Sequence, residues 1–180
     1  MALSMCVSAC ELLTGDAVRE WSEEVELDHG DVVIVERRVE FTKSNSISGD
    51  TYGTSVRKST LVVKGEGAAL PIWDDVLQPL VLYRDYEALE WVLVASTTNC
   101  LTYRRRGRPK PTYWEFRLQG SSWVETALSP GSLERQTNLF FLYDDPVPNH
   151  LTLARKASFS LARIDETYLS IRPDSTFNCG

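Results

Sequence analysis

The residues best suited to chemistry form a basic run that begins at Arg104 and reads RRRGRPKP. Its core, Arg106-Gly107-Arg108-Pro109, has the form of an AT-hook, in which glycine lets the backbone approach the minor groove and the arginines lie along it. The whole chain carries a net charge of −6, however, and a DNA-binding protein must neutralise phosphates. Nucleic acid is therefore ranked last among the partners of this run. A solvated connector ranks first and contact with anionic lipid or lipopolysaccharide phosphate second. The cations concerned are Arg104, Arg105, Arg106, Arg108 and Lys110.

Two pairs of adjacent carboxylates, Asp74-Asp75 and Asp144-Asp145, are the candidates for acid–base catalysis. Such catalysis needs two carboxyl groups that converge on one cleft, whereas neighbouring residues of a strand point to opposite faces. His150 is a candidate base, but no Gly-x-Ser-x-Gly motif supplies a nucleophile. We therefore predict no catalytic residues. A hydrolase built on the Asp74/Asp75 and Asp144/His150 regions is the alternative.

Cysteine usage favours an oxidising compartment. A disulfide between Cys100 and Cys179 would close a loop of about 80 residues, which stabilises the fold by about 4 kcal/mol through chain entropy. It would pin the C-terminal tail and hold the Cα atoms about 4.4–6.8 Å apart. Two buried free thiols are the alternative. The cysteines form no C-x₂-C pair, and His29 and His150 stand alone, so no metal or cofactor is expected.

The N-terminus has the form of a lipoprotein signal. Val7-Ser8-Ala9-Cys10 matches a lipobox, which predicts lipidation of Cys10. No Lys or Arg precedes Cys10 and the apolar run is short, so we expect the true start to lie upstream of Met1. An ordinary cytosolic N-terminus is the alternative. Residues 1–20 are interpreted as the remnant of a signal and a tether, and 21–180 as one β-rich globular domain.

Hydrophobic periodicity predicts the elements that must position these residues. Trp21 to Phe41 alternates with a period of two around the Asp28-His29-Gly30-Asp31 turn, which predicts a long β-hairpin. A polar loop over 43–58 follows. Residues 87–95 read as a central strand, and 113–125 as a second hairpin.

The C-terminal third has a weaker pattern. Ser129-Pro130 resembles a helix start, 138–143 a strand, and 150–162 carries helical spacing. With 180 residues, 43% of them hydrophobic, the chain suits one domain. We predict a mainly β fold, an antiparallel sheet or β-sandwich with one or two short helices in the C-terminal third. Three tryptophans are assigned to the core: Trp91, Trp114 and Trp123. Trp73 is expected to be partly exposed.

Several segments together resemble an uncharacterised family of proteobacterial lipoproteins or exported proteins. They are Trp-x-Glu-Glu-Val-x-Leu-x-x-Gly at 21–30, Trp91 to Ala95 followed by Cys100, the 113–118 strand, and Asn138-Leu139. The resemblance covers most of 21–180 and implies fold and compartment but no active site. We therefore expect a non-catalytic, membrane-tethered protein of the cell envelope, facing the periplasm, that binds a protein or an anionic surface.

Overall fold

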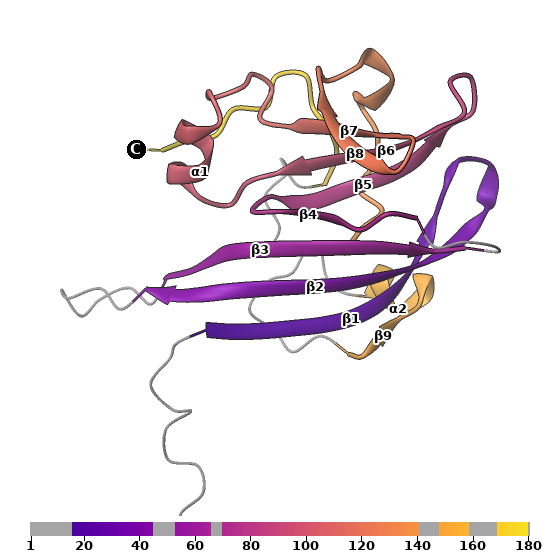
Figure 1. Ribbon diagram of the computed structural model, residues 1–180, viewed down its shortest axis with the longest axis horizontal. Helices are drawn as coiled ribbons and strands as arrows, with labels where there is room; N and C mark the ends of the chain where they lie inside the picture. Colours follow the sequence, from indigo (N-terminus) through magenta and orange to yellow (C-terminus); the bar gives the residue numbers. More distant parts are fainter. Residues whose placement is uncertain (1–15, 45–52, 66–69, 141–147, 159–168, 180) are drawn as a thin grey trace, which may run out of the picture.

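Two β-sheets face each other in the computed structural model, which describes residues 16–44, 53–65, 70–140, 148–158 and 169–179 (Figure 1). The strands are β1 (Asp16–Glu26), β2 (Val32–Ser44), β3 (Gly53–Lys64), β4 (Trp73–Asp75), β5 (Gln78–Asp85), β6 (Glu90–Ser96), β7 (Trp114–Gln119), β8 (Ser122–Thr126) and β9 (His150–Leu151). Sheet A has the order β4-β3-β2-β1-β9 and sheet B the order β5-β6-β7-β8. The short helices are α1 (Cys100–Arg105) and α2 (Leu153–Ser158), with 3-10 turns η1 (Asp28–Gly30) and η2 (Pro130–Ser132).

The predicted mainly β sandwich is thus confirmed, and its helices differ in place from the prediction. Of the two α-helices in the described residues, α2 lies in the C-terminal third, whereas α1 lies in mid-chain where a loop was expected. The helix predicted at Pro130 is only the turn η2. Over 150–162, a two-residue strand precedes α2, and residues 159–162 lie outside the described residues. No helix of the described residues is long and apolar enough to cross a membrane.

The hairpin of β1 and β2 has the predicted turn but is longer than predicted. Its register runs from Glu26↔Val32 to Asp16↔Thr42. His29 and Gly30 reverse the chain with φ of 72° and 83°. Because β1 begins at Asp16, residues 16–20 pair with β2 and are not part of a tether. Likewise β3 begins at Gly53, so the end of the predicted 43–58 loop is strand.

The main core lies between the sheets and is built from the alternate residues of each strand. Val25, Val35 and Leu61 of sheet A face Leu93 and Phe116 of sheet B, and all are buried. The opposite face of sheet B is also covered, by side chains of the C-terminal third. Burial on both faces explains the continuous apolar runs at 79–83 in β5 and 91–95 in β6.

Three of the four tryptophan assignments need correction. Trp73, predicted to be partly exposed, is buried at 2% exposure and packs edge-to-face on Phe116, with ring centroids 5.4 Å apart. Its exposed neighbour Asp74 points the other way, as alternate residues of a strand do. Trp114 is buried as predicted, whereas Trp91 and Trp123 are only half-buried at the margin of the core.

A buried charge cluster joins α2 to sheet A. The Glu23 carboxylate, fully buried, accepts hydrogen bonds from Arg37 Nη1 at 2.9 Å and Lys156 Nζ at 2.7 Å. The Arg37 guanidinium lies over the Trp21 ring, 5.0 Å from its centroid. Burial lowers the pKa of Lys156, and the charge of Glu23 opposes that shift. Lys156 donates further bonds to carbonyl oxygens of Glu24 and Asn138, so all three of its donors are used.

The turn after β8 is held by a second buried carboxylate, Glu115. Its Oε2 accepts hydrogen bonds from Ser129 N, Ser129 Oγ and Ser132 Oγ at 2.6–2.8 Å. Its Oε1 accepts from Arg117 Nε at 2.8 Å. Burial by itself raises the pKa of Glu115, but these hydrogen bonds together hold it below its usual value. Glu115 therefore stays ionised and fixes η2 against sheet B.

The edge of sheet B at β5 is covered by Asn138 and Leu139, whose backbone amides donate to Leu80 O at 3.2 and 3.1 Å. Asn138 Oδ1 accepts from Leu82 N at 2.9 Å, and its Nδ2 donates to the carbonyls of Leu82 and Glu26 at 2.7 and 2.9 Å. The amide group thus replaces a neighbouring strand and ties β5 to β1. Residues 138–140 are therefore not the strand that was predicted, and 141–143 lie outside the described residues.

Candidate binding site at helix α1

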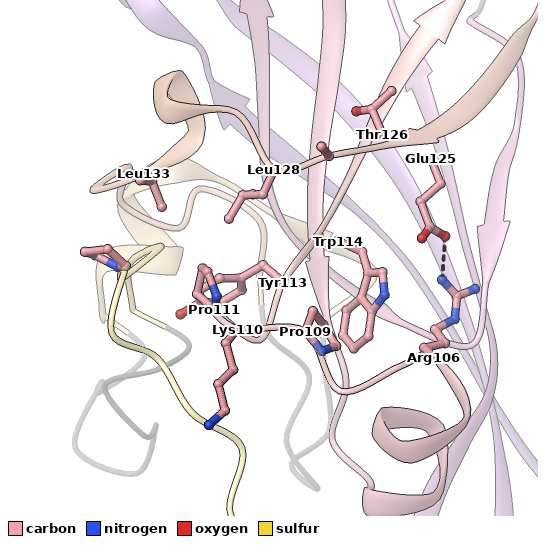
Figure 2. A pocket seen from close by; sticks show the side chains of 12 residues that line it. Arg106, Pro109, Lys110, Pro111, Tyr113, Trp114, Glu125, Thr126, Leu128 and Leu133 are labelled. Carbon is pink, nitrogen blue, oxygen red and sulfur yellow. Dashed lines mark hydrogen bonds and ion pairs between the residues drawn. The ribbon is translucent and has the colours of Figure 1, made fainter.

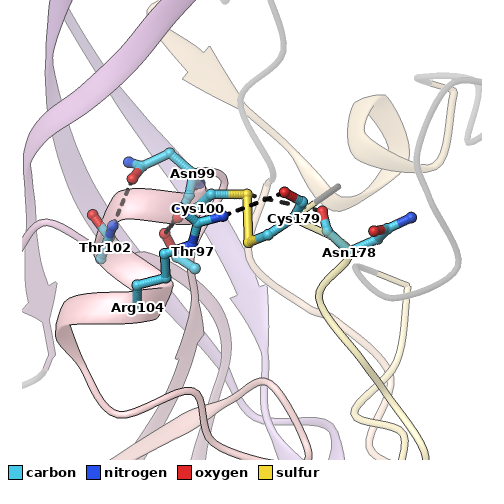
Figure 3. Close-up of a disulfide and its surroundings, with 7 residues drawn as sticks. All are labelled: Thr97, Asn99, Cys100, Thr102, Arg104, Asn178 and Cys179. Carbon is cyan, nitrogen blue, oxygen red and sulfur yellow. Dashed lines mark hydrogen bonds between the residues drawn. A yellow bond between two sulfur atoms is a disulfide. The ribbon is translucent and has the colours of Figure 1, made fainter.

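Helix α1 is anchored to the C-terminal tail by a disulfide. Cys100 and Cys179 are bonded, with Cα atoms 5.4 Å apart, so the pairing predicted from the sequence is present (Figure 3). Asn99 caps the helix, because its Oδ1 accepts from Thr102 N at 2.8 Å. Phe177 of the tail packs on Tyr103, with ring centroids 5.2 Å apart. The tail is therefore a fixed part of the α1 region.

The sequence predicts that the basic run projects into solvent unless acidic groups face it, and the fold places acidic groups against one of its cations. Arg106 turns inward and forms ion pairs with Asp75 and with Glu125, the latter at 2.9 Å. Its guanidinium also lies 5.9 Å from the Trp114 ring centroid (Figure 2). An AT-hook needs both Arg106 and Arg108 along a groove, which Arg106 cannot reach while it keeps these ion pairs.

The other four cations of the run are exposed around this point. Arg104 and Arg105 belong to the last turn of α1. Gly107 and Arg108, with φ of 84° and 54°, then turn the chain back so that Arg108 N donates to Tyr103 O at 3.0 Å. Arg108 and Lys110 lie exposed on the returning segment. The fold thus gathers four exposed positive charges at one end of the sandwich.

Of these four cations, Lys110 lines a pocket of about 440 Å³, which we call the α1 pocket (Figure 2). Aromatic, leucine and proline side chains make up much of its wall: Tyr113, Trp114, Leu128, Leu133, Pro109, Pro111 and Pro173. Its polar lining includes Arg106, Lys110, Glu125 and Thr126. Thr126 Oγ1 is buried and has no hydrogen-bond partner among the described atoms. An apolar wall beside exposed cations suits a ligand with an apolar body and negative charge.

The carboxylate pairs do not form a catalytic dyad. Asp74 points outward to Lys58 at 3.0 Å, whereas Asp75 pairs with Arg106 and accepts a hydrogen bond from Leu77 N at 3.1 Å. This divergence is the one expected of neighbouring strand residues. The Asp144-Asp145 pair and Cys10 lie outside the described residues.

His150 has neighbours that the sequence analysis did not identify. Its Nδ1 lies 2.8 Å from Ser22 Oγ, and its Nε2 lies 3.9 Å from Glu24 Oε1, an order that resembles a serine–histidine–carboxylate set. A nucleophilic serine also needs amide donors for the oxyanion. The Ser22 amide already donates to Asn149 O at 2.9 Å. We therefore assign these contacts to the pairing of β9 with β1.

Ser22 and His150 are 128 residues apart, so no local motif reveals their contact. In the part of the chain that the structure describes, no three His, Cys, Asp or Glu residues are grouped as ligands for a metal ion.

No protein-family model, no curated protein and no solved structure matches this chain. The function is therefore inferred from the site itself.

The two arginines at the centre of the basic run should differ in their effect on folding. We expect Arg106→Ala to lower the free energy of unfolding by about 1–2 kcal/mol, because it leaves the mostly buried Asp75 carboxylate without its ion pair. Arg108→Ala, at an exposed position, should change it by less than about 0.5 kcal/mol. Urea unfolding of both variants measures the difference. Equal effects would show that the inward ion pairs of Arg106 contribute nothing.

Proposed function

We propose that this protein is a non-catalytic, exported binding protein, tethered to the membrane through Cys10, whose α1 pocket receives an acidic segment of a partner protein. The observation that carries the proposal is a concave, aromatic and proline-rich wall that includes the exposed Lys110, with three more exposed cations in the same basic run. Both features lie in a chain whose net charge is −6.

Charge supports a specific place for the partner. An acidic segment is repelled by the protein as a whole and attracted only where positive charge is concentrated. Because Arg106 is neutralised by Asp75 and Glu125, the attraction comes from Arg104, Arg105, Arg108 and Lys110. The field around α1 therefore guides an acidic partner to the pocket in preference to the rest of the surface.

Shape favours a protein segment over a flat membrane surface. The volume of about 440 Å³ lies within the range of small-ligand sites, so the pocket has room for side chains. A flat surface of lipid phosphates would contact the exposed cations without filling the space beside Trp114. A segment with alternating apolar and acidic side chains can do both.

The disulfide and the lipobox support the place of action. A disulfide such as Cys100–Cys179 persists in oxidising compartments and is rare in the bacterial cytosol. Lipidation at Cys10 would leave 16–179, where all the described structure lies, outside the bilayer.

A ten-residue peptide of alternating Glu and Val, labelled with fluorescein, tests the proposal by fluorescence anisotropy at low salt. We expect wild-type protein to bind it and the Arg108→Ala/Lys110→Ala variant to bind at least about tenfold more weakly, a difference of about 1.4 kcal/mol. The matched control is Lys58→Ala/Lys64→Ala, which removes the same charge from exposed positions of β3. Its affinity should stay within about twofold of wild type, because both lysines belong to β3 and neither lines the α1 pocket.

Two results would contradict the proposal. If the two double variants lose the same amount of peptide affinity, binding depends only on the net charge of the protein and not on the position of the cations. Binding of wild type to phosphatidylglycerol vesicles but not to the peptide would mean that the partner is a membrane.

A further inference from the structure

Strand β8 borders the α1 pocket and ends one side of sheet B. In the described residues it pairs with β7 alone, whereas the opposite edge, β5, is covered by Asn138. Ser122, Val124 and Glu125 of β8 are all exposed. A strand edge of this kind presents backbone N–H and C=O groups that can pair with another chain.

The register identifies which backbone groups are open. Gly120 and Ser121 form a two-residue turn, so the flanking Gln119 and Ser122 are a hydrogen-bonded pair. Hydrogen-bonded and non-hydrogen-bonded pairs alternate along an antiparallel ladder. The pairs Arg117↔Val124 and Glu115↔Thr126 are therefore also bonded. It follows that the N–H and C=O groups of Trp123 and Glu125 point away from β7.

The end of β8 that carries these open groups also lines the α1 pocket. Glu125 to Leu128 line it, so a chain paired with Trp123 and Glu125 would run on beside the pocket wall. Side chains on one face of that chain would meet the side of β8 that carries Glu125 and its partner Arg106. The unpaired Thr126 Oγ1 and the exposed Lys110 line the same pocket.

We infer that the acidic segment binds as an added β-strand along β8, through the open backbone groups of Trp123 and Glu125. This inference rests on the proposed function, since it specifies how the same ligand is held. Backbone pairing supplies affinity that does not depend on sequence, while the pocket and the cations select an apolar and acidic pattern. The open edge is thus the docking surface for a partner strand.

The test compares Glu125→Pro with Glu125→Ala, using the same alternating Glu and Val peptide. Both variants lose the carboxylate that pairs with Arg106, but only proline also removes the outward N–H. Because that N–H is not bonded to β7, both variants should fold, with thermal midpoints within a few degrees of each other. We expect Glu125→Pro to bind at least about tenfold more weakly than Glu125→Ala.

Two further arms keep the test decisive. A peptide N-methylated at alternate residues should lose binding to wild-type protein, whatever the folding of the proline variant. Hydrogen exchange should show new protection of the Trp123 and Glu125 amides when the unmodified peptide binds.

Three outcomes would overturn the inference. If Glu125→Pro and Glu125→Ala bind equally while Arg108→Ala/Lys110→Ala still loses affinity, the segment occupies the pocket without strand pairing, and only the inference fails. If wild type binds no peptide at all, the proposed function fails with it. If wild type sediments as a dimer that Glu125→Pro dissociates, the edge is occupied by a second copy of this chain.

Discussion

Replacing Glu23 by leucine should lower the free energy of unfolding by about 3–5 kcal/mol. The substitution removes the carboxylate that forms ion pairs with both Arg37 and Lys156, and so leaves Arg37 buried without its ion pair and Lys156 with only the weaker attraction of Glu24. The penalty is increased by Arg37 itself, whose Nε and Nη2 have no hydrogen-bond partner among the described atoms. Urea unfolding at pH 7 measures the change.

The matched control for this prediction is Glu26→Leu, an exposed carboxylate on the same strand, which should change stability by less than about 0.5 kcal/mol. A second control replaces the whole cluster, as Glu23→Leu with Arg37→Met and Lys156→Met. It should recover much of the loss, since well-packed apolar residues often replace a buried ionic cluster without cost. A loss below about 1 kcal/mol for Glu23→Leu alone would contradict the buried cluster.

Loss of the disulfide should have an effect of similar size. The Cys100→Ser/Cys179→Ser variant is expected to unfold with a free energy about 4 kcal/mol lower than oxidised wild type, because the bond closes a loop with a sequence separation of 79. Thermal unfolding in the presence of dithiothreitol supplies the control: there the two proteins should unfold alike. A difference that persists under reducing conditions would assign the effect to the serine substitutions and not to the bond.

The sequence predicts those parts of the fold in which the burial of a residue follows from the pattern of its neighbours along the chain. Trp21, Val25 and Leu27 alternate with polar residues, so the β1–β2 hairpin follows from periodicity and one turn. Glu23 lies on the same face of β1 as these residues and is therefore buried. Its burial depends on Arg37 and on Lys156, which is 133 residues away. A pattern within one segment cannot reveal such a partner.

The same reason explains the corrections at the candidate site. The acids that hold Arg106 inward come from β4 and β8, so the basic run alone does not show which of its cations they face. Trp73 was judged from the acids beside it, although the orientation of β4 places its ring on Phe116. The pairing of Cys100 with Cys179, which the structure contains, is predicted because a disulfide agrees with the export signal at Cys10.

The most direct measurement of the central claim is the position of a bound acidic segment. The Glu and Val peptide, carrying a benzophenone at its centre, is irradiated with wild-type protein, and the cross-linked residues are identified by mass spectrometry. We predict cross-links within 106–114 and 123–128, the loop and strand that line the α1 pocket. Cross-links concentrated in the hollow on the outer face of sheet A, beside Glu36, Arg38 and Thr60, would contradict the account.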